Sequence, residues 1–437
     1  MTRRRVLAAW IAAVALTGAA APAQVSDGIQ TFDAAWTIVR DSFYDPSMNG
    51  VDWNAVRTEL RPQAAAAHTN GELRAVIRDM IGRLGQSHFA LLASSSDSPV
   101  SGSSGSADVS GDPGFDVRLA GGDLLVTRVD PHGAAAQAGV RTGWRLSAIG
   151  STPIAELLGA LPEEASDRLR NVEAWRLAQT RLRGPVGSSL PVAFEDGSGG
   201  SRAVSIVRQP ETGSPVTVGN LPTMFVRVQS ASRATPNGRT AGVIGFNVWM
   251  PAVDARFQEA IDRFRQADGI VIDLRGNPGG LAAMLMGISG HFLDERVALG
   301  TMKTRTSDLR FTANPRLVNA KGERVAPYSG PVAILIDAMS GSASECFAGG
   351  MQSLGRARVF GQISMGQALP ALFDQLPNGD VLIHAYGDFV TASGVRLEGR
   401  GVIPDQRVPL RREDLLAGRD ATLDAALTWI DSVAAGR

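Results

Sequence analysis

Hydrophobic residues recur every three or four positions near the start of the chain, which is the period of an α-helix. The stretches TFDAAWTIVRDSFYDPSMNGVDWNAVRTELRPQAAAA and GELRAVIRDMIGRL both follow this period. We therefore predict an N-terminal helical region over residues 24–93. The next residues, 94–113, are rich in Ser and Gly and contain few apolar side chains, which is typical of a flexible linker.

The pattern changes to short alternating runs over residues 114–208. DLLVTRV and LPVAFED alternate apolar and polar positions as half-buried strands do, and Gly and Pro residues separate such runs. One helical stretch, PIAELLGAL, interrupts them. The pattern predicts a compact β-rich domain.

The last part of the chain, residues 209–437, alternates apolar strands with helices. In order it contains AGVIGFNV, ARFQEAIDRFRQ, GIVIDLRG, LAAMLMGISGHFL, PVAILID and ECFAGGMQSLG. Apolar strands separated by helices of this length indicate an α/β layer with parallel pairing. The predicted fold class is therefore α/β, with two or three domains in the whole chain.

Composition excludes several classes of partner and cofactor. Lys+Arg and Asp+Glu both total 43, so no overall charge draws the chain to nucleic acid or to an anionic membrane. A single cysteine, Cys346, excludes an internal disulfide, and the five histidines have no metal-ligand spacing. We expect no metal and no other cofactor. Lysine is scarce, since only Lys303 and Lys321 are present.

The first residues, MTRRRVLAAWIAAVALTGAAAPAQ, combine three arginines, a short apolar run and a small-residue cleavage pattern. They predict a signal peptide over residues 1–23, cut after Ala23, and an extracytoplasmic or periplasmic location. An uncleaved membrane anchor is the alternative. After cleavage we expect no stable membrane insertion, and the sequence leaves open whether export uses the general or the twin-arginine route.

Two junctions between a strand and a helix could carry chemistry. The first is Asn277-Pro278-Gly279-Gly280, directly after the apolar strand in GIVIDLRG. A Gly pair there lets backbone amides face a site, as an oxyanion hole requires, although a tight turn explains the same residues.

The second junction is MSGSASECFAGG, which follows PVAILID. Ser342 and Glu345 fit the S-x-x-E pattern of a helix capping box. The same geometry would place the Ser342 hydroxyl at the positive end of a helix dipole, where developing negative charge is stabilised. A cap and an active site are both open at this point.

The β-rich part resembles a PDZ domain of the bacterial protease type, over GDPGFDVRLAGGDLLVTRVDPHGAAAQAGVRTGWRLSAIGSTPI. The resemblance implies that Gly114 and Phe115 present backbone amides to the terminal carboxylate of a bound peptide, which would add a strand to the sheet edge. A turn that opens a β domain is the simpler interpretation of Gly-Phe alone.

Five segments together resemble the carboxy-terminal processing (tail-specific) and tricorn-core serine peptidases. They are FYDP, GQSHF, GIVIDLRGNPGG, GSASECFAGGMQSLGRARVFGQISMGQ and RLEGRGVIPD. The resemblance implies an α/β core of the crotonase/ClpP-like peptidase type with an inserted PDZ domain and an N-terminal helical region. It also implies that Ser342 is the nucleophile, and that the oxyanion is held by the amide of Ala343 and one from Gly279 or Gly280.

The residue that removes the serine proton distinguishes the two branches of this family. The carboxy-terminal processing branch uses a lysine in a segment where this chain has Gln367, and a neutral amide is no general base. The tricorn-core branch uses a histidine, an adjacent serine and a glutamate, which correspond here to His88, Ser87 and Glu398. We expect Ser87 or a backbone carbonyl to fix the histidine tautomer. Glu398 would polarise the site directly or through Ser344, and Gln367 could bind substrate backbone or be a plain loop amide.

These inferences predict an exported serine endopeptidase that acts on protein or peptide substrates and tethers their C-terminal regions through a PDZ domain. The alternative is a non-catalytic peptide- or ligand-binding protein on the same scaffold, which the missing lysine favours. Hydrolysis of an unfolded protein, lost on replacement of Ser342, would separate the two.

Overall fold

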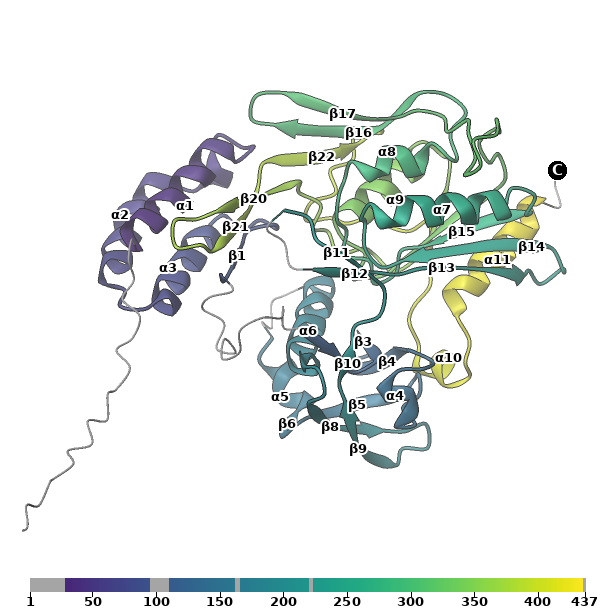
Figure 1. Cartoon of the computed structure of the whole chain (residues 1–437), viewed down its shortest axis with the longest axis horizontal. Helices are drawn as coiled ribbons and strands as arrows, with labels where there is room; N and C mark the ends of the chain where they lie inside the picture. The colour runs from purple at the N-terminus through teal and green to yellow at the C-terminus, as the bar shows by residue number, and fades with distance from the viewer. Residues whose placement is uncertain (1–27, 95–109, 162–165, 220–222, 435–437) are drawn as a thin grey trace, which may run out of the picture.

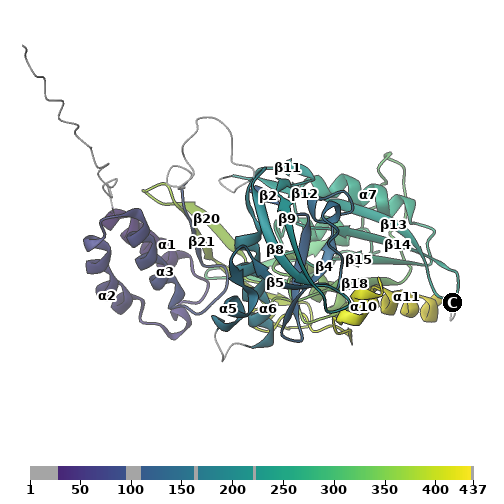
Figure 2. The same ribbon diagram turned by 90° about the horizontal axis from the view of Figure 1, so that it is seen from below.

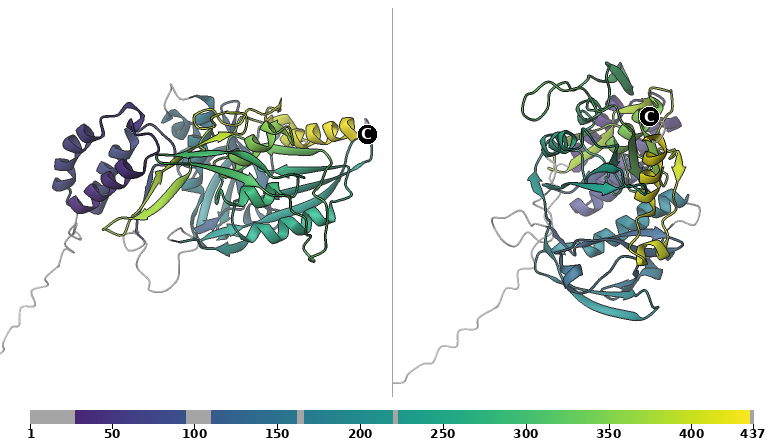
Figure 3. Two further views of the ribbon diagram at one scale, coloured as in Figure 1. Left: turned by 90° about the horizontal axis from the view of Figure 1, so that it is seen from above. Right: turned by 90° about the vertical axis from the view of Figure 1, so that its right-hand side faces the viewer.

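The computed structural model describes residues 28–94, 110–161, 166–219 and 223–434. The predicted signal peptide and residues 95–109 of the predicted linker lie outside these ranges. Figure 1 shows three helices at one end of the molecule, an α/β core at the other, and a β-rich part beside the core. Views at right angles keep the three helices and the C-terminus at opposite ends (Figures 2 and 3).

The helical end consists of three helices, a 3-10 turn and one short strand. These are α1 (Gly28–Ser42), η1 (Met48–Gly50), α2 (Trp53–Ala66), α3 (Asn70–Gly82) and β1 (Ala90–Leu92). Asp52 caps α2 by accepting the Ala55 amide, and Thr69 caps α3 by accepting the Glu72 amide. The apolar faces of the helices pack on the hairpin of β20 (Ala371–Gln375) and β21 (Val381–Ala385). Because β1 pairs antiparallel with β21, the segment between α3 and β1 is held against the core.

The β-rich part is built on a sheet with the order β3-β4-β5-β8-β9, with β6 against β5, and a smaller sheet with the order β10-β2-β7. Its elements are β2 (Ser110–Asp112), β3 (Phe115–Ala120), β4 (Asp123–Val129), α4 (Ala134–Gln137), β5 (Arg145–Ile149), β6 (Thr152–Pro153), α5 (Ile154–Gly159), α6 (Asp167–Leu182), β7 (Gly184–Pro185), β8 (Ser189–Glu195), β9 (Ser201–Val207) and β10 (Gln209–Pro210).

Two of these elements differ from the prediction. Strand β2 lies inside the predicted linker. Helix α6, 16 residues long, was not predicted, because it buries only Val172, Ala174, Ala178 and Leu182, a narrow stripe made mostly of small side chains. Figure 1 shows α6 standing between the β-rich part and the core.

The core is a six-stranded sheet with the order β13-β14-β15-β18-β19-β23, in which all pairs but β13–β14 are parallel. The predicted parallel α/β layer is therefore confirmed. Its elements are β13 (Val228–Ala234), β14 (Thr240–Phe246), α7 (Ala252–Arg263), β15 (Gly269–Asp273), α8 (Met284–Ser289), β18 (Val332–Ile336), α9 (Ala343–Ser353), β19 (Arg358–Gly361), β23 (Gln406–Arg407) and α11 (Ala421–Ala434).

Both faces of this sheet are covered, which explains why its central strands β15 and β18 are almost wholly apolar. Ile270 and Ile272 point into a cluster with α7, α8 and α9, whereas Val271 points into a second cluster with α11. The remaining elements flank the core: β11 (Ser214–Val216), β12 (Met224–Val226), β16 (Val297–Thr304), β17 (Asp308–Ala313), β22 (Gly387–Thr391) and α10 (Arg412–Leu416).

Strands β15 and β18 are parallel neighbours, so the loops at their carboxyl ends lie side by side. The Gly341 amide donates to the Asn277 carbonyl at 3.0 Å, which joins the two loops directly. This edge of an open α/β sheet is where ligands usually bind. In the described ranges no helix has the length and apolar character needed to cross a bilayer.

Candidate active site

Ser342 stands at the junction between β18 and α9 in a strained backbone conformation. Its φ of 49° and ψ of −117° lie in a region that favours glycine. Only four described residues other than glycine have positive φ, and they are Met48, Asn49, His88 and Ser342. A half-buried serine on such a strand-to-helix turn presents its hydroxyl outward, as the nucleophiles of other hydrolases do.

Glu345 holds the Ser342 backbone in place from the first turn of α9. Its carboxylate is fully buried and accepts the Ser342 amide at 3.0 Å, the glutamate half of the predicted capping box. The same carboxylate accepts three further hydrogen bonds, from the Ser364 hydroxyl at 2.6 Å and from the amides of Gly366 and Gln367 at 2.6 and 3.0 Å. Burial raises the pKa of Glu345 to about 7, although these four donors oppose the shift.

The Gly pair of the first loop packs against Ser342. A Cβ on Gly279 would lie 2.6 Å from the Ser342 Cβ and 3.0 Å from the Ala343 nitrogen, so only glycine fits there. The Gly279 amide donates to the Asn277 side chain at 3.0 Å. Among the described residues, the amides of Gly280 and Ala343 have no hydrogen-bond partner. Two free backbone donors therefore belong to the two loops that meet beside Ser342.

Ser87, His88 and Glu398 form one hydrogen-bonded unit, although residues 87 and 398 are 311 positions apart. The Ser87 hydroxyl lies 2.8 Å from Nδ1 of His88 and donates to Oε2 of Glu398 at 2.9 Å. Glu398 also accepts the amides of Ser87 at 3.1 Å and Ala368 at 2.8 Å. The link from Glu398 to the histidine runs through Ser87 and not through Ser344, which sequence reasoning had offered as one route. Ser344 instead donates to the Asn277 carbonyl and accepts from Trp249.

This unit fixes the tautomer of His88. The hydroxyl of Ser87 has one hydrogen, and a carboxylate can only accept, so that hydrogen goes to Glu398. The Ser87 oxygen must then accept from Nδ1–H of His88, which leaves Nε2 of a neutral ring unprotonated. Burial, and secondly the positive charge of Arg176, lower the pKa of His88 to about 4, so the ring is neutral at pH 7.

Gln367 connects the histidine side of the site to the serine side. Its carbonyl accepts the Ser342 amide at 2.9 Å, and its side-chain oxygen accepts Arg176 at 3.0 Å. The neighbouring residue, Ala368, donates to Glu398. The described residues show no hydrogen bond between the Ser342 hydroxyl and the His88 ring, so the two are joined through this loop.

Two arginines of α6 reach the site, and sequence reasoning missed both. Arg168 donates to the carbonyls of Met365 and Gly399, and Arg176 contacts Gln367. Both lie on the helix that the sequence did not predict. Their spacing of eight residues, about two helical turns, is the one signal that could have placed them on a common face.

The predicted ligand-binding pair of the β-rich part lies elsewhere. The Gly114 amide donates to the Asp112 side chain at 2.7 Å, and Phe115 is buried against Phe194. Neither Gly114 nor Phe115 makes a hydrogen bond to the other predicted site residues within the described ranges.

Side chains for other chemistries are not gathered near Ser342. Lys303 and Lys321 are both exposed, on β16 and on a turn after β17. Cys346 is buried one turn beyond Ser342, and burial raises the pKa of its thiol. The part of the chain that the structure describes contains no group of three or more side chains able to hold a metal ion.

Family models match two segments of the chain. Residues 240–408 match the model for peptidase family S41, and residues 29–82 match the model for the tricorn protease C1 domain.

Curated relatives cover most of the chain. Carboxyl-terminal-processing peptidase 3, chloroplastic, from Arabidopsis thaliana is 25% identical over 396 residues, which is 86% of this chain and 68% of the relative. The carboxyl-terminal-processing protease of Picosynechococcus sp. is 24% identical over 385 residues, covering 86% of this chain and 82% of the relative.

Solved structures share the fold. The photosystem II D1 C-terminal processing protease superimposes with a TM-score of 0.57 at 22% identity, over 91% of this chain and 99% of that one. Mature CPAF complexed with lactacystin gives a TM-score of 0.62 at 14% identity, over 94% of this chain and 99% of that one. These structures show the shared fold. Together with the match of residues 240–408 to peptidase family S41 and the relatives named carboxyl-terminal-processing proteases, the resemblance is confirmed, and the chain is a serine-type peptidase.

Proposed function

We propose that the chain is an exported endopeptidase in which Ser342 attacks the peptide carbonyl and Nε2 of His88 accepts the serine proton. His88 then returns the proton to the leaving amine, and water repeats the cycle on the acyl-enzyme. Ser87 and Glu398 hold the histidine tautomer. The set is a Ser-His-Ser-Glu tetrad in place of a Ser-Lys dyad.

The observation that carries this proposal is the hydrogen-bonded chain from Glu398 through Ser87 to Nδ1 of His88. A glutamate that orients a neutral histidine through a serine has the role of the buried aspartate in a Ser-His-Asp triad, which holds the tautomer and orientation of the histidine. The low pKa of His88, about 4, keeps the base available at neutral pH. Hydrogen bonds between nucleophile and base are often formed only in the substrate complex. We therefore expect the Ser342 hydroxyl and the His88 ring to come within hydrogen-bond distance when substrate binds.

The oxyanion would be held by the amides of Ala343 and Gly280. The Gly279 amide is engaged with Asn277, whereas those of Gly280 and Ala343 have no partner among the described residues. This favours Gly280 over Gly279 as the second donor, with Gly279 needed for close approach to Ser342. Removing one such donor costs about 10²- to 10³-fold in kcat.

We propose further that the β-rich part is a PDZ-type domain that tethers the C-terminal region of protein substrates. Strand β3 is an edge strand that could accept a peptide strand, next to Gly114 and Phe115. Asp116 on β3 accepts Trp175 and Gln179 of α6 at 3.0 Å each, so a bound peptide would have to displace these bonds. Export would follow from the signal-like residues 1–23.

Hydrolysis of casein by the mature protein tests the mechanism. The wild type should cleave, and Ser342→Ala and His88→Ala should each lose nearly all turnover. Gln367→Ala is the matched variant in the same loop and should keep much of it. Retained activity in His88→Ala, or its loss only in Gln367→Ala, would refute the tetrad, and an inert wild type would favour the non-catalytic binding protein.

A further inference from the structure

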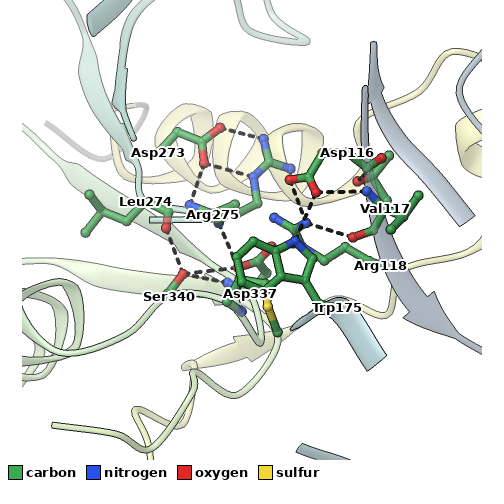
Figure 4. Close-up of polar contacts among 12 residues, drawn as sticks. Asp116, Val117, Arg118, Trp175, Asp273, Leu274, Arg275, Asp337 and Ser340 are labelled. Carbon is green, nitrogen blue, oxygen red and sulfur yellow. Dashed lines mark hydrogen bonds and ion pairs between the residues drawn. The ribbon is translucent and has the colours of Figure 1, made fainter. Parts of the chain in front are cut away.

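We infer that Asp337 is a positioning residue for the oxyanion hole and that Arg118, from the β-rich part, supplies its counter-charge. The inference rests on the proposed function, because it concerns the amides that would hold the oxyanion. Figure 4 shows the residues that carry it, where the ends of β15 and β18 meet β3.

One oxygen of Asp337 ties together the two loops that bear the proposed oxyanion donors. Oδ1 accepts the Gly276 amide at 2.8 Å and the Met339 amide at 3.0 Å. Gly276 directly precedes Asn277 and the Gly pair, and Met339 lies three residues before Ser342. Together with the bond between the Gly341 amide and the Asn277 carbonyl, this carboxylate therefore sets the spacing between the Gly280 and Ala343 amides.

Ser340 strengthens the same junction. Its hydroxyl donates to the Leu274 carbonyl at 2.8 Å, at the end of β15, and its oxygen accepts the Asp337 amide at 3.0 Å. Ser340 is fully buried, so these bonds are protected from water.

The other oxygen of Asp337 is held by the β-rich part. Oδ2 accepts Nε of Arg118 at 2.9 Å, and the side chains of Arg118 and Asp337 are only 9% and 13% exposed. Arg118 also donates from Nη1 to Asp116 at 2.7 Å, and Asp116 in turn accepts Trp175 and Gln179 of α6. Strand β3 and helix α6 thereby fix the guanidinium that neutralises Asp337 (Figure 4).

Arg118 also packs directly on the oxyanion loop. A Cβ on Gly276 would lie 2.6 Å from Nη2 of Arg118, and Gly276 has a φ of +73°, so the loop and the guanidinium fit only because this residue is glycine. A cavity of about 470 Å³, lined by Asp116, Arg118 and Asp337 among others, borders the contact. Beside the cavity, Val172 and Trp175 of α6 pack on Ala338, Met339 and Met365, so the ion pair is the polar part of a contact that also has an apolar part.

Loss of Arg118 would leave the Asp337 charge nearly buried and without its partner. Such a carboxylate draws in water, which weakens the bonds to Gly276 and Met339. The two loops would then separate, and transition-state stabilisation would fall while the substrate-binding surface stays in place.

The test compares Arg118→Met and Asp337→Asn with a matched control, Arg412→Met. Arg412 also joins the core to the β-rich part, through Glu195 at 2.9 Å, but it does not contact either loop. For each variant one would measure kcat and KM on a peptide substrate and the rate at which a fluorophosphonate phosphonylates Ser342 with loss of fluoride. Thermal melting followed by circular dichroism would check folding.

We expect Arg118→Met and Asp337→Asn to lower kcat and the phosphonylation rate by about 10- to 100-fold with KM within about threefold, less than the loss of a whole oxyanion donor. The double variant should be no worse than the poorer single one, because both remove one interaction. Arg412→Met should behave as wild type. If Asp337→Asn does not fold, the comparison of Arg118→Met with Arg412→Met tests the inference without it.

A wild-type kcat in Arg118→Met would overturn the inference. An equal loss in Arg412→Met would overturn it as well, because general docking of the β-rich part on the core would then explain the result. A wild type that neither cleaves nor is phosphonylated at Ser342 would instead refute the proposed function, and the two failures are therefore distinguishable.

Discussion

The Ser87 hydroxyl donates to Oε2 of Glu398 at 2.9 Å and by doing so fixes which nitrogen of the next residue carries a proton. Glu398 lies in a turn after β22, and Ser87 lies between α3 and β1, so the histidine is oriented only when the helical end packs on the core.

Glu398→Gln should therefore lower kcat with little effect on KM. The amide has only one accepting oxygen, whereas Glu398 accepts from the Ser87 hydroxyl and from the amides of Ser87 and Ala368. We expect a loss of about 10- to 1000-fold, below that of removing the base itself. Steady-state kinetics on a peptide substrate measure it, with Glu413→Gln on α10 as the control. An unchanged kcat would show that the tautomer of His88 does not depend on Glu398.

The sequence predicted the segments that carry the catalytic residues better than it predicted the contacts that fix those segments in place. Ser342, His88 and Glu398 belong to short motifs that can be recognised from their own residue types, and β18, the strand before Ser342, is apolar throughout. Arg118 and Asp337 are 219 positions apart, and an arginine on an alternating strand is usually solvated, so their contact had no local signal. Helix α6 was missed for a related reason, since its buried stripe is narrow and half of it is alanine.

Arg176→Met should move the acid limb of kcat/KM to higher pH. Burial is the main reason that the pKa of His88 lies near 4, and the charge of Arg176 is the second reason. Removing the charge of Arg176 leaves the effect of burial and raises the pKa of His88. The base therefore becomes protonated at a higher pH than in the wild type, and activity is lost at that higher pH. A pH–rate profile measures the shift. Arg181→Met, an exposed position on the same helix, is the control, and an acid limb that stays in place would contradict the assignment of His88.

Glu345→Gln should change how stability depends on pH. The pKa of Glu345 is raised from 4.5 to about 7, so between these values the folded state binds the extra proton and the free energy of unfolding falls as pH rises. His88 has the opposite effect, because its lowered pKa makes the unfolded state bind the proton between pH 4 and 6.5.

In the wild type these two effects partly cancel. Glu345→Gln removes the first of them, so between pH 5 and 7 the unfolding free energy of the variant should rise by about 2 kcal/mol more than that of the wild type. Urea unfolding at the two pH values measures the difference. Glu323→Gln, on an exposed turn, controls for the loss of one charge, and parallel curves for wild type and Glu345→Gln would contradict the raised pKa.

Ser342→Gly should unfold at a higher temperature than Ser342→Ala, although both lack the nucleophile. At a φ of 49° and a ψ of −117° a Cβ is strained, and a residue held in such a region costs about 1–3 kcal/mol. Alanine keeps that Cβ and glycine removes it, so glycine should gain about 1 kcal/mol even after its larger loss of backbone entropy. Thermal melts of the two variants, with Ser353→Gly against Ser353→Ala at the ordinary helical end of α9, measure the effect. Equal melting temperatures for the Ser342 pair would mean that the serine is not held under strain, and the turn would then be a helix cap with no sign of conformational energy stored for catalysis.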